Sequence, residues 1–201
     1  MGRGEDAVRL YRQAAEIFFE LRDVRSEGVA LSNAADRLIE LGRLDDARRE
    51  ALRAIDCKAP FGHTGEAWMT FMILHKLEQA AGNPDAAAQA RGKAIAAYLA
   101  YRRAEGEPPS GGLVPELCVA VAQALAGGQP QEAGMRLGEL GGRSDLPAYL
   151  QPVLPALEAI LQGSRDPALA EDPALDYDDA AELRLLLERL KPLGPQAEGG
   201  R

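Results

Sequence analysis

A short turn-like motif returns at a fixed interval along the first half of the chain, and this repeat restricts the possible folds more than any other feature. Each copy begins with glycine, carries an acidic residue and closes in alanine, and the closing alanines are forty residues apart. A constant period of this length predicts an array of stacked structural units. The copies are GRGEDA (2–7), GRLDDA (42–47) and GNPDAA (82–87), which close at Ala7, Ala47 and Ala87.

Amphipathic helices are predicted on both sides of these turns. Apolar and small residues share one helical face before the second copy, as at Leu31 and Leu38, and after it, as at Ala51 and Ala54. The chain is rich in alanine and leucine, whereas aromatic residues make up only 5% of it, and this bias favours helix over sheet. We therefore expect an all-α fold in which each turn closes a helical hairpin.

The turns also carry signals for helix ends. Gly42 and Gly82 follow the last periodic residue of a helix, where a left-handed residue commonly ends it. Asp45 and Asp85 stand where the next helix begins, and a carboxylate there can accept hydrogen bonds from free N–H groups. The sequence thus predicts glycine at the end of one helix and an aspartate cap at the start of the next.

A fourth, less regular copy is GGQPQEA (127–133), which arrives six residues later than the period predicts. The surplus falls in residues 102–112, whose prolines and glycines break helix. After residue 142 the period is lost, although apolar spacing still predicts helices over about 153–162 and 178–190. The predicted organisation is a half repeat followed by three hairpins (1–142), a C-terminal helical cap (143–192) and a disordered tail (193–201).

The first unit contains only half of a hairpin, because Ala7 belongs to a second helix whose first helix would precede Met1. The chain is then either a C-terminal fragment of a longer protein or opens with a single capping helix. We favour the fragment, since an unpaired apolar helix face is costly to expose. Self-association of the chain through this half repeat is a further possibility.

Residues 2–140 resemble the tetratricopeptide repeat family, in its longer-period form with about forty residues per unit. That family places bulky, small and aromatic residues in a set order along the two helices of each hairpin. Leu38 and Glu78 replace the aromatic residue of the first helix, and Ala51 and Arg91 that of the second. The resemblance implies an α-α superhelix, and it depends most on the second copy, through Leu31, Ala34, Ala35, Leu38, Gly42, Ala47, Ala51 and Ala54.

The resemblance also implies a concave groove, lined by residues of the first helices, that holds a peptide or protein segment. Asn33 matches a family position whose amide hydrogen-bonds the backbone of a bound peptide. By the same register the groove residues are Ser32, Asn33, Asp36 and Glu40 in the second copy, Met69, Met72, Ile73 and Lys76 in the third, and Cys118, Val119 and Ala122 in the fourth.

One connection is more distinctive than a linker requires. In KAPFGHTGEAW (58–68), Pro60 and the glycines predict a non-helical loop that also carries Phe61 and His63. Two interpretations stay open: Phe61 packs with Trp68 against the neighbouring hairpin, or Phe61 and His63 form part of a contact surface.

Composition excludes several other functions. The net charge of −8 and pI of about 4.9 argue against nucleic-acid and anionic-membrane surfaces. No apolar run approaches the roughly 18 residues of a membrane span, and the N-terminus lacks a signal peptide. Two cysteines do not form a disulfide framework, which favours a cytoplasmic location, and the excess of arginine over lysine hints at a GC-rich bacterial genome.

No constellation for chemistry stands out. Cys57, His63, His75 and Cys118 have no usual zinc-ligand spacing, and the acidic segment 172–182 does not fit a calcium loop. We therefore expect no catalytic residue, metal or cofactor. The sequence predicts a non-catalytic scaffold that binds a protein or peptide partner, with a regulatory sensor region cut from a larger multidomain protein as the alternative.

Overall fold

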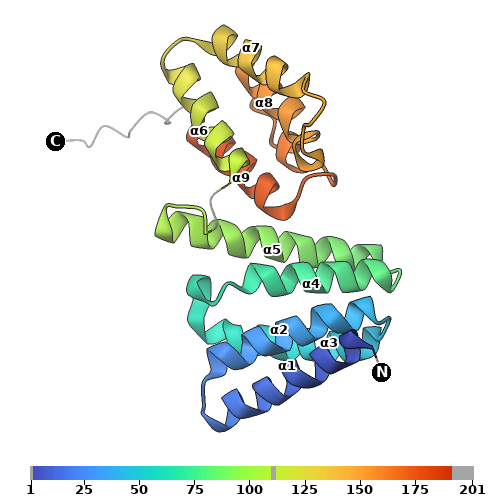
Figure 1. Cartoon of the computed structure of the whole chain (residues 1–201). Coiled ribbons are helices and arrows are strands. Elements are labelled where there is room, and N and C mark those ends of the chain that lie inside the picture. The colour runs from blue at the N-terminus through green and yellow to red at the C-terminus, as the bar shows by residue number, and fades with distance from the viewer. Residues whose placement is uncertain (1, 110–111, 192–201) are drawn as a thin grey trace, which may run out of the picture. The chain divides into compact units, whose positions relative to one another are not determined.

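A computed structural model describes residues 2–109 and 112–191 of the chain. Every regular element among these residues is helical, as the sequence predicts. The chain divides into two compact units at Gly106, each with its own packed helices (Figure 1). This boundary lies within the predicted repeat array, not at its expected end after residue 142.

The first unit is a run of successive helices joined by short turns (Figure 1). α2 packs on α1 and α3, α4 packs on α3 and α5, and α2 also contacts α4. The elements are α1 (Arg3–Glu20), α2 (Val24–Glu40), α3 (Leu44–Lys58), the 3-10 segment η1 (Ala59–Gly65), α4 (Ala67–Ala80) and α5 (Pro84–Glu105).

The glycine signals mark the helix ends correctly. Gly42 and Gly82 have φ angles of +71° and +74°, the left-handed conformation that a residue with a Cβ adopts at a cost. The residue after each glycine donates its N–H back across the end of the helix, from Arg43 to Leu38 O at 2.9 Å and from Asn83 to Glu78 O at 2.8 Å. The two turns are therefore built in the same way.

The predicted aspartate caps, in contrast, lie two residues after the residues that occupy the N-cap positions. The N-caps of α3 and α5 are Arg43 and Asn83, so Asp45 and Asp85 stand inside the first turn and accept no capping hydrogen bond. The side chain of Asp45 is 96% exposed. Their contribution is the favourable interaction of a negative charge with the helix N-terminus.

A further turn, which the forty-residue motif does not predict, joins α1 to α2. Arg22 occupies the left-handed position with φ of +57°, and Asp23 donates its N–H to Phe18 O at 2.9 Å. Asp23 also caps α2, because its Oδ1 accepts the N–H of Ser26 at 3.1 Å. This turn repeats the geometry of Gly42 with an arginine where the others have glycine.

Large aliphatic side chains packed into alanine-lined positions form the core of the first unit. Leu38 and Leu77 are fully buried, and so are Ala47 and Ala54 on the facing helix. Close helix packing of this kind depends on small residues at the contact. At the far end, Trp68 is 3% exposed and its ring lies 5.8 Å from that of Tyr98, edge to face.

The second unit joins the predicted fourth hairpin to the predicted cap. α6 packs on α7, α8 and α9, and α7 packs on α8, so these helices share one core. α8 and α9 correspond to the helices predicted at 153–162 and 178–190, while the predicted tail (193–201) lies outside the described residues. The elements are α6 (Leu113–Ala126), α7 (Pro130–Gly141), η2 (Ala148–Leu150), α8 (Val153–Leu161), η3 (Pro167–Ala170) and α9 (Tyr177–Arg189).

A helix that crosses a bilayer must be long and apolar, and none of the described helices meets both requirements.

Candidate functional site

α2 and α4, the first helices of successive hairpins, are joined by two side-chain contacts. The hydroxyl oxygens of Ser32 and Thr70 lie 2.8 Å apart, and Lys76 Nζ lies 3.6 Å from Asp36 Oδ1. The structure therefore places the helices that carry the groove residues predicted from the second and third copies side by side. We refer to the solvent-facing side chains of α2 and α4, from Val29 to Glu40 and from Met69 to Lys76, as the α2–α4 face.

Ser32 does not belong to this face, which corrects the sequence prediction. Ser32 is 5% exposed, and its hydroxyl donates a hydrogen bond to Gly28 O at 2.9 Å. With that proton committed, the hydrogen bond to Thr70 must be donated by the Thr70 hydroxyl, which is fully buried. Ser32 is a helix-packing residue that holds α2 against α4.

The other predicted groove residues reach solvent to different degrees. Asn33, Glu40, Met69 and Lys76 are exposed. Asp36, Met72 and Ile73 are half-buried in the same two helices.

Val29 is a member of the α2–α4 face that the sequence analysis missed. Its side chain is 48% exposed, and Met69, forty residues later, is 53% exposed. The two residues occupy equivalent positions in successive repeats, so the forty-residue spacing from Met69 could have identified Val29 in the sequence. Together they leave a patch of apolar side chain open to solvent at matching places on adjacent helices.

Charges on the α2–α4 face are mutually compensated. Asp36 accepts from Arg37 at 3.3 Å and faces Lys76, while Arg37 also donates to Glu40 at 2.6 Å. Within the described part of the chain, the exposed amide of Asn33 has no hydrogen-bond partner. The face thus combines apolar side chains, a free amide and balanced charge, and it offers no nucleophile–base pair.

The loop at 58–68 is more ordered than a non-helical connection. It forms the 3-10 segment η1, interrupted at Gly62, and Arg25 on α2 donates to Thr64 O at 2.8 Å. Phe61 is half-buried, and His63 Nε2 lies 3.2 Å from Glu105 Oε1 on α5. These contacts attach the loop to α2 and α5, and His63 lies at the surface.

A buried lysine begins this loop, and nothing in the sequence signalled it. Lys58 is 4% exposed, and burial lowers the pKa of its ammonium group. Glu66 acts in the opposite direction, and the positive charge of Arg25 lowers the pKa further. The close fit continues at Gly65, where a Cβ would lie 2.6 Å from Lys58 O.

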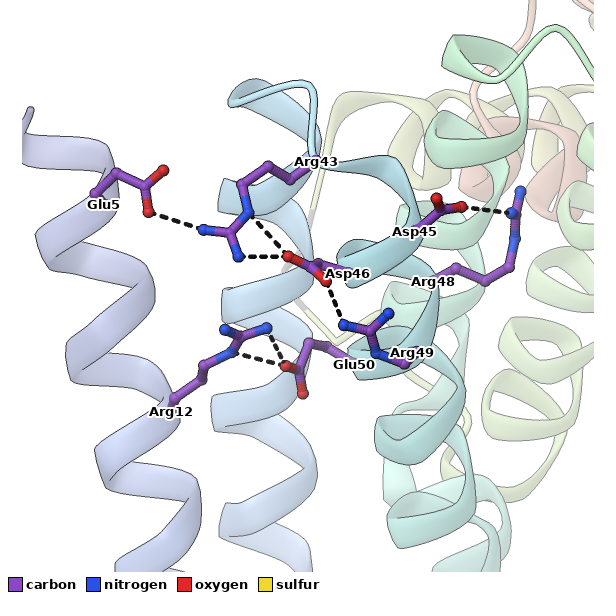
Figure 2. A network of polar contacts seen from close by, with 8 residues as sticks. All are labelled: Glu5, Arg12, Arg43, Asp45, Asp46, Arg48, Arg49 and Glu50. Atoms are coloured by element: carbon purple, nitrogen blue, oxygen red, sulfur yellow. Dashed lines mark hydrogen bonds and ion pairs between the residues drawn. The ribbon is translucent and has the colours of Figure 1, made fainter.

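A network of charged side chains connects α1 to α3 (Figure 2). Arg43 donates to Glu5 at 3.0 Å and also pairs with Asp46, and Arg12 pairs with Glu50 at 2.6 Å. Hydrogen bonding from Arg43 lowers the pKa of the Asp46 carboxyl. Because each carboxylate already has an arginine partner, this network stacks two helices and leaves no free charge for a ligand.

A second ion pair connects α3 to α4. Arg48 donates to both carboxylate oxygens of Glu78, at 3.0 and 2.8 Å, and Asn83 donates to one of them at 2.8 Å. Glu78 is 7% exposed, and the hydrogen bond from Arg48 is the main cause of its lowered pKa. The residue that replaces an aromatic side chain of the resembled family is therefore a paired, buried carboxylate.

The second unit holds a cleft of about 370 Å³ between α6 and α7. Leu117 and Leu137 are among its apolar lining residues, and Arg136 pairs there with Glu132 at 2.7 Å. The fourth-copy residues Cys118, Val119 and Ala122 all belong to α6 and hence to this unit. They are not part of the α2–α4 face.

Metal-ligating residues do not gather anywhere in the described ranges 2–109 and 112–191: no group of three His, Cys, Asp or Glu side chains is placed to hold an ion. Cys57 and Cys118 are buried, and burial raises the pKa of the Cys57 thiol. At the start of α9, burial and the nearby Asp178 raise the pKa of Asp179 to about 7.

Comparisons with known proteins give no match for this chain. The sequence matches no protein-family model and no curated protein. No solved structure matches it either.

Proposed function

We propose that the first unit is a tetratricopeptide-type helical array that binds a segment of a protein partner on the α2–α4 face, without catalytic turnover. The observation that carries the proposal is the pair Val29 and Met69, which are both about half exposed at equivalent positions of successive repeats. Solvent-exposed apolar side chains that recur in register on adjacent helices favour a contact surface over isolated exposure.

The framework beneath this surface supports binding. The Ser32–Thr70 hydrogen bond and the buried Leu38 and Leu77 fix α2 and α4 to their neighbours. A pre-organised surface loses little conformational freedom when a partner binds, so more of the contact energy appears as affinity. A substitution that removes one of these packing contacts would disturb the α2–α4 face, although the substituted residue does not itself contact the ligand.

The composition of the face specifies the kind of segment it fits. Val29, Met69 and the half-buried Met72 form an apolar strip, and methionine adapts its shape to different side chains. Asn33 both donates and accepts hydrogen bonds, which suits an exposed peptide backbone. The balanced charges of Asp36 and Lys76 fit a segment with an apolar centre and flanking charges of both signs.

The test is selection of peptides from a random display library on the full chain, followed by measurement of their dissociation constants. We expect Met69→Glu to weaken a selected peptide at least tenfold, because it places a charge in the apolar strip. Leu52→Glu is the matched control, since Leu52 is 48% exposed on α3, away from this face. Equal effects of the two substitutions, or none from Met69→Glu, would contradict the proposal.

A regulatory sensor role within a larger multidomain protein remains a prediction from the sequence. The described residues add no observation in its favour, and the peptide-binding test does not depend on it.

A further inference from the structure

One side of α1 carries an apolar stripe whose large side chains the first unit leaves mostly exposed. Leu10, Ile17 and Leu21 are 58%, 55% and 70% exposed. Ala7 and Ala14 are half-buried at the edge of the same stripe, and Ala14 also packs against the core cluster that contains Ala15 and Leu31. These residues recur with the alternating spacing of three and four that places side chains along one seam of a helix.

The packing of α2 on α3 indicates what such a stripe contacts. In that hairpin Leu31 shares a buried cluster with Ala54, and Leu38 shares another with Ala47. One helix thus contributes large aliphatic side chains, and the antiparallel helix receives them on alanines seven residues apart. The large residues, like the alanines, are separated by two helical turns.

α1 carries both halves of this arrangement on one stripe. Leu10 and Ile17 have the spacing of Leu31 and Leu38, and their chemical type. Ala7 and Ala14 stand forty residues before Ala47 and Ala54, the receiving alanines of α3. A surface that contains large side chains and their receiving positions in this order is complementary to itself when the second helix runs antiparallel.

We propose that α1 is a self-association surface that pairs two copies of this chain through antiparallel α1 helices. Leu10 of each copy packs on Ala14 of the other, and Ile17 packs on Ala7. A two-fold axis generates each contact twice, so four large-into-small contacts close the pair. In this dimer, α1 of the second copy packs on α1 in the way that α2 packs on α3 within one chain.

Charges at the ends of the stripe match this register. Arg3 and Glu20 are exposed near opposite ends of α1, and neither has a partner within residues 2–109 and 112–191. The antiparallel register brings Arg3 of one copy close to Glu20 of the other at both ends of the pair. Opposite charges at such flanking positions set the orientation of paired helices.

The size of the stripe sets the expected strength of the dimer. A single pair of helices with three exposed aliphatic side chains each falls near or below the area of about 1,200 Å² that marks weaker, transient complexes. We therefore expect a reversible dimer whose population rises with concentration.

The experiment is light scattering and sedimentation equilibrium on the full chain, in a dilution series that reaches the millimolar range. We expect the mass to rise from monomer to dimer. Leu10→Glu with Ile17→Glu is expected to weaken dimerisation at least a hundredfold, because each copy then places two charges in the seam. Leu52→Glu, at a leucine of similar exposure on α3, should leave it unchanged.

Reversal of the end charges tests the register. Arg3→Glu alone should weaken the dimer several-fold, and addition of Glu20→Arg should restore it, since the attraction is rebuilt with its signs exchanged. A chain that stays monomeric, or a dimer that survives both stripe substitutions, would overturn the proposal. A charge swap that weakens the dimer further would overturn the antiparallel register.

Discussion

The hydrogen bond between Ser32 and Thr70 gives the sharpest test of how the first unit is held together. Thr70 is fully buried and Ser32 is 5% exposed, so neither hydroxyl has water as an alternative partner. The Ser32 proton goes to Gly28 O, which leaves the Thr70 proton for Ser32 Oγ. Removal of Ser32 Oγ therefore strands a buried donor.

The magnitudes follow from this geometry. Ser32→Ala should lower the free energy of unfolding by about 2 kcal/mol, because an unpaired buried donor costs about 1–3 kcal/mol. Thr70→Val keeps the shape of the side chain and loses one neutral hydrogen bond, which costs about 1 kcal/mol. In the double variant the stranded donor is gone, so we expect a loss of about 1–2 kcal/mol and a coupling energy of about 1 kcal/mol.

Urea unfolding of the four proteins, followed by circular dichroism, measures this cycle. The slope of unfolding free energy against urea should stay constant, so that the midpoints report stability alone. If the stability losses of the two single variants sum to the loss of the double variant within about 0.3–0.5 kcal/mol, the reasoning is refuted, since independent sites behave in that way. Ser32→Ala with unchanged stability but weaker peptide binding would return Ser32 to the groove.

Three further predictions concern single sites. Arg22→Gly should raise the free energy of unfolding, measured in urea, by about 1 kcal/mol, since glycine adopts the left-handed conformation at this position without the Cβ penalty. Arg9→Gly is the control: it lies inside α1 and should lower the free energy of unfolding by about as much. Asp179 has a pKa of about 7 in the folded chain, above its ordinary value, so the folded chain holds this proton more tightly than the unfolded chain. The stability that results is lost as the pH rises, and thermal unfolding should show it falling from about pH 5 to pH 8. Asp179→Asn should remove this trend. Arg48→Val should lower the free energy of unfolding by about 2 kcal/mol because it leaves the Glu78 carboxylate buried without its main partner, and Glu78→Leu in the same chain should restore most of the loss in urea unfolding.

The helices and their glycine-ended turns were predictable because their signals are local. Gly42 and Gly82 are required by backbone conformation alone, and the apolar spacing around them needs no knowledge of distant contacts. The turn at Arg22 was missed because an arginine there gives no such signal. Its geometry is imposed by the packing of α1 on α2, and tertiary contacts of this kind override local preference.

The candidate site was predictable only in outline. The repeat register placed Asn33, Asp36 and Met69 on the two helices that form the α2–α4 face, but it did not distinguish the side of α2 that faces α4 from the side that faces solvent. Ser32 was therefore assigned to the groove, and Val29 was left out, although the forty-residue relation to Met69 was present in the sequence. The burial of Lys58 depends on the path of the following loop, which periodicity does not describe.

Successive repeats fill one equivalent pair of positions with opposite chemistry, and the pair includes Leu38 and Glu78. Leu38 is fully buried in a cluster with Val8 on α1. Forty residues later the same two positions are held by Glu78 and Arg48, which form a bidentate ion pair between α4 and α3. An apolar pair and an ion pair thus connect each first helix to the second helix before it. Because both partners change together, each position keeps a satisfied contact between the two helices.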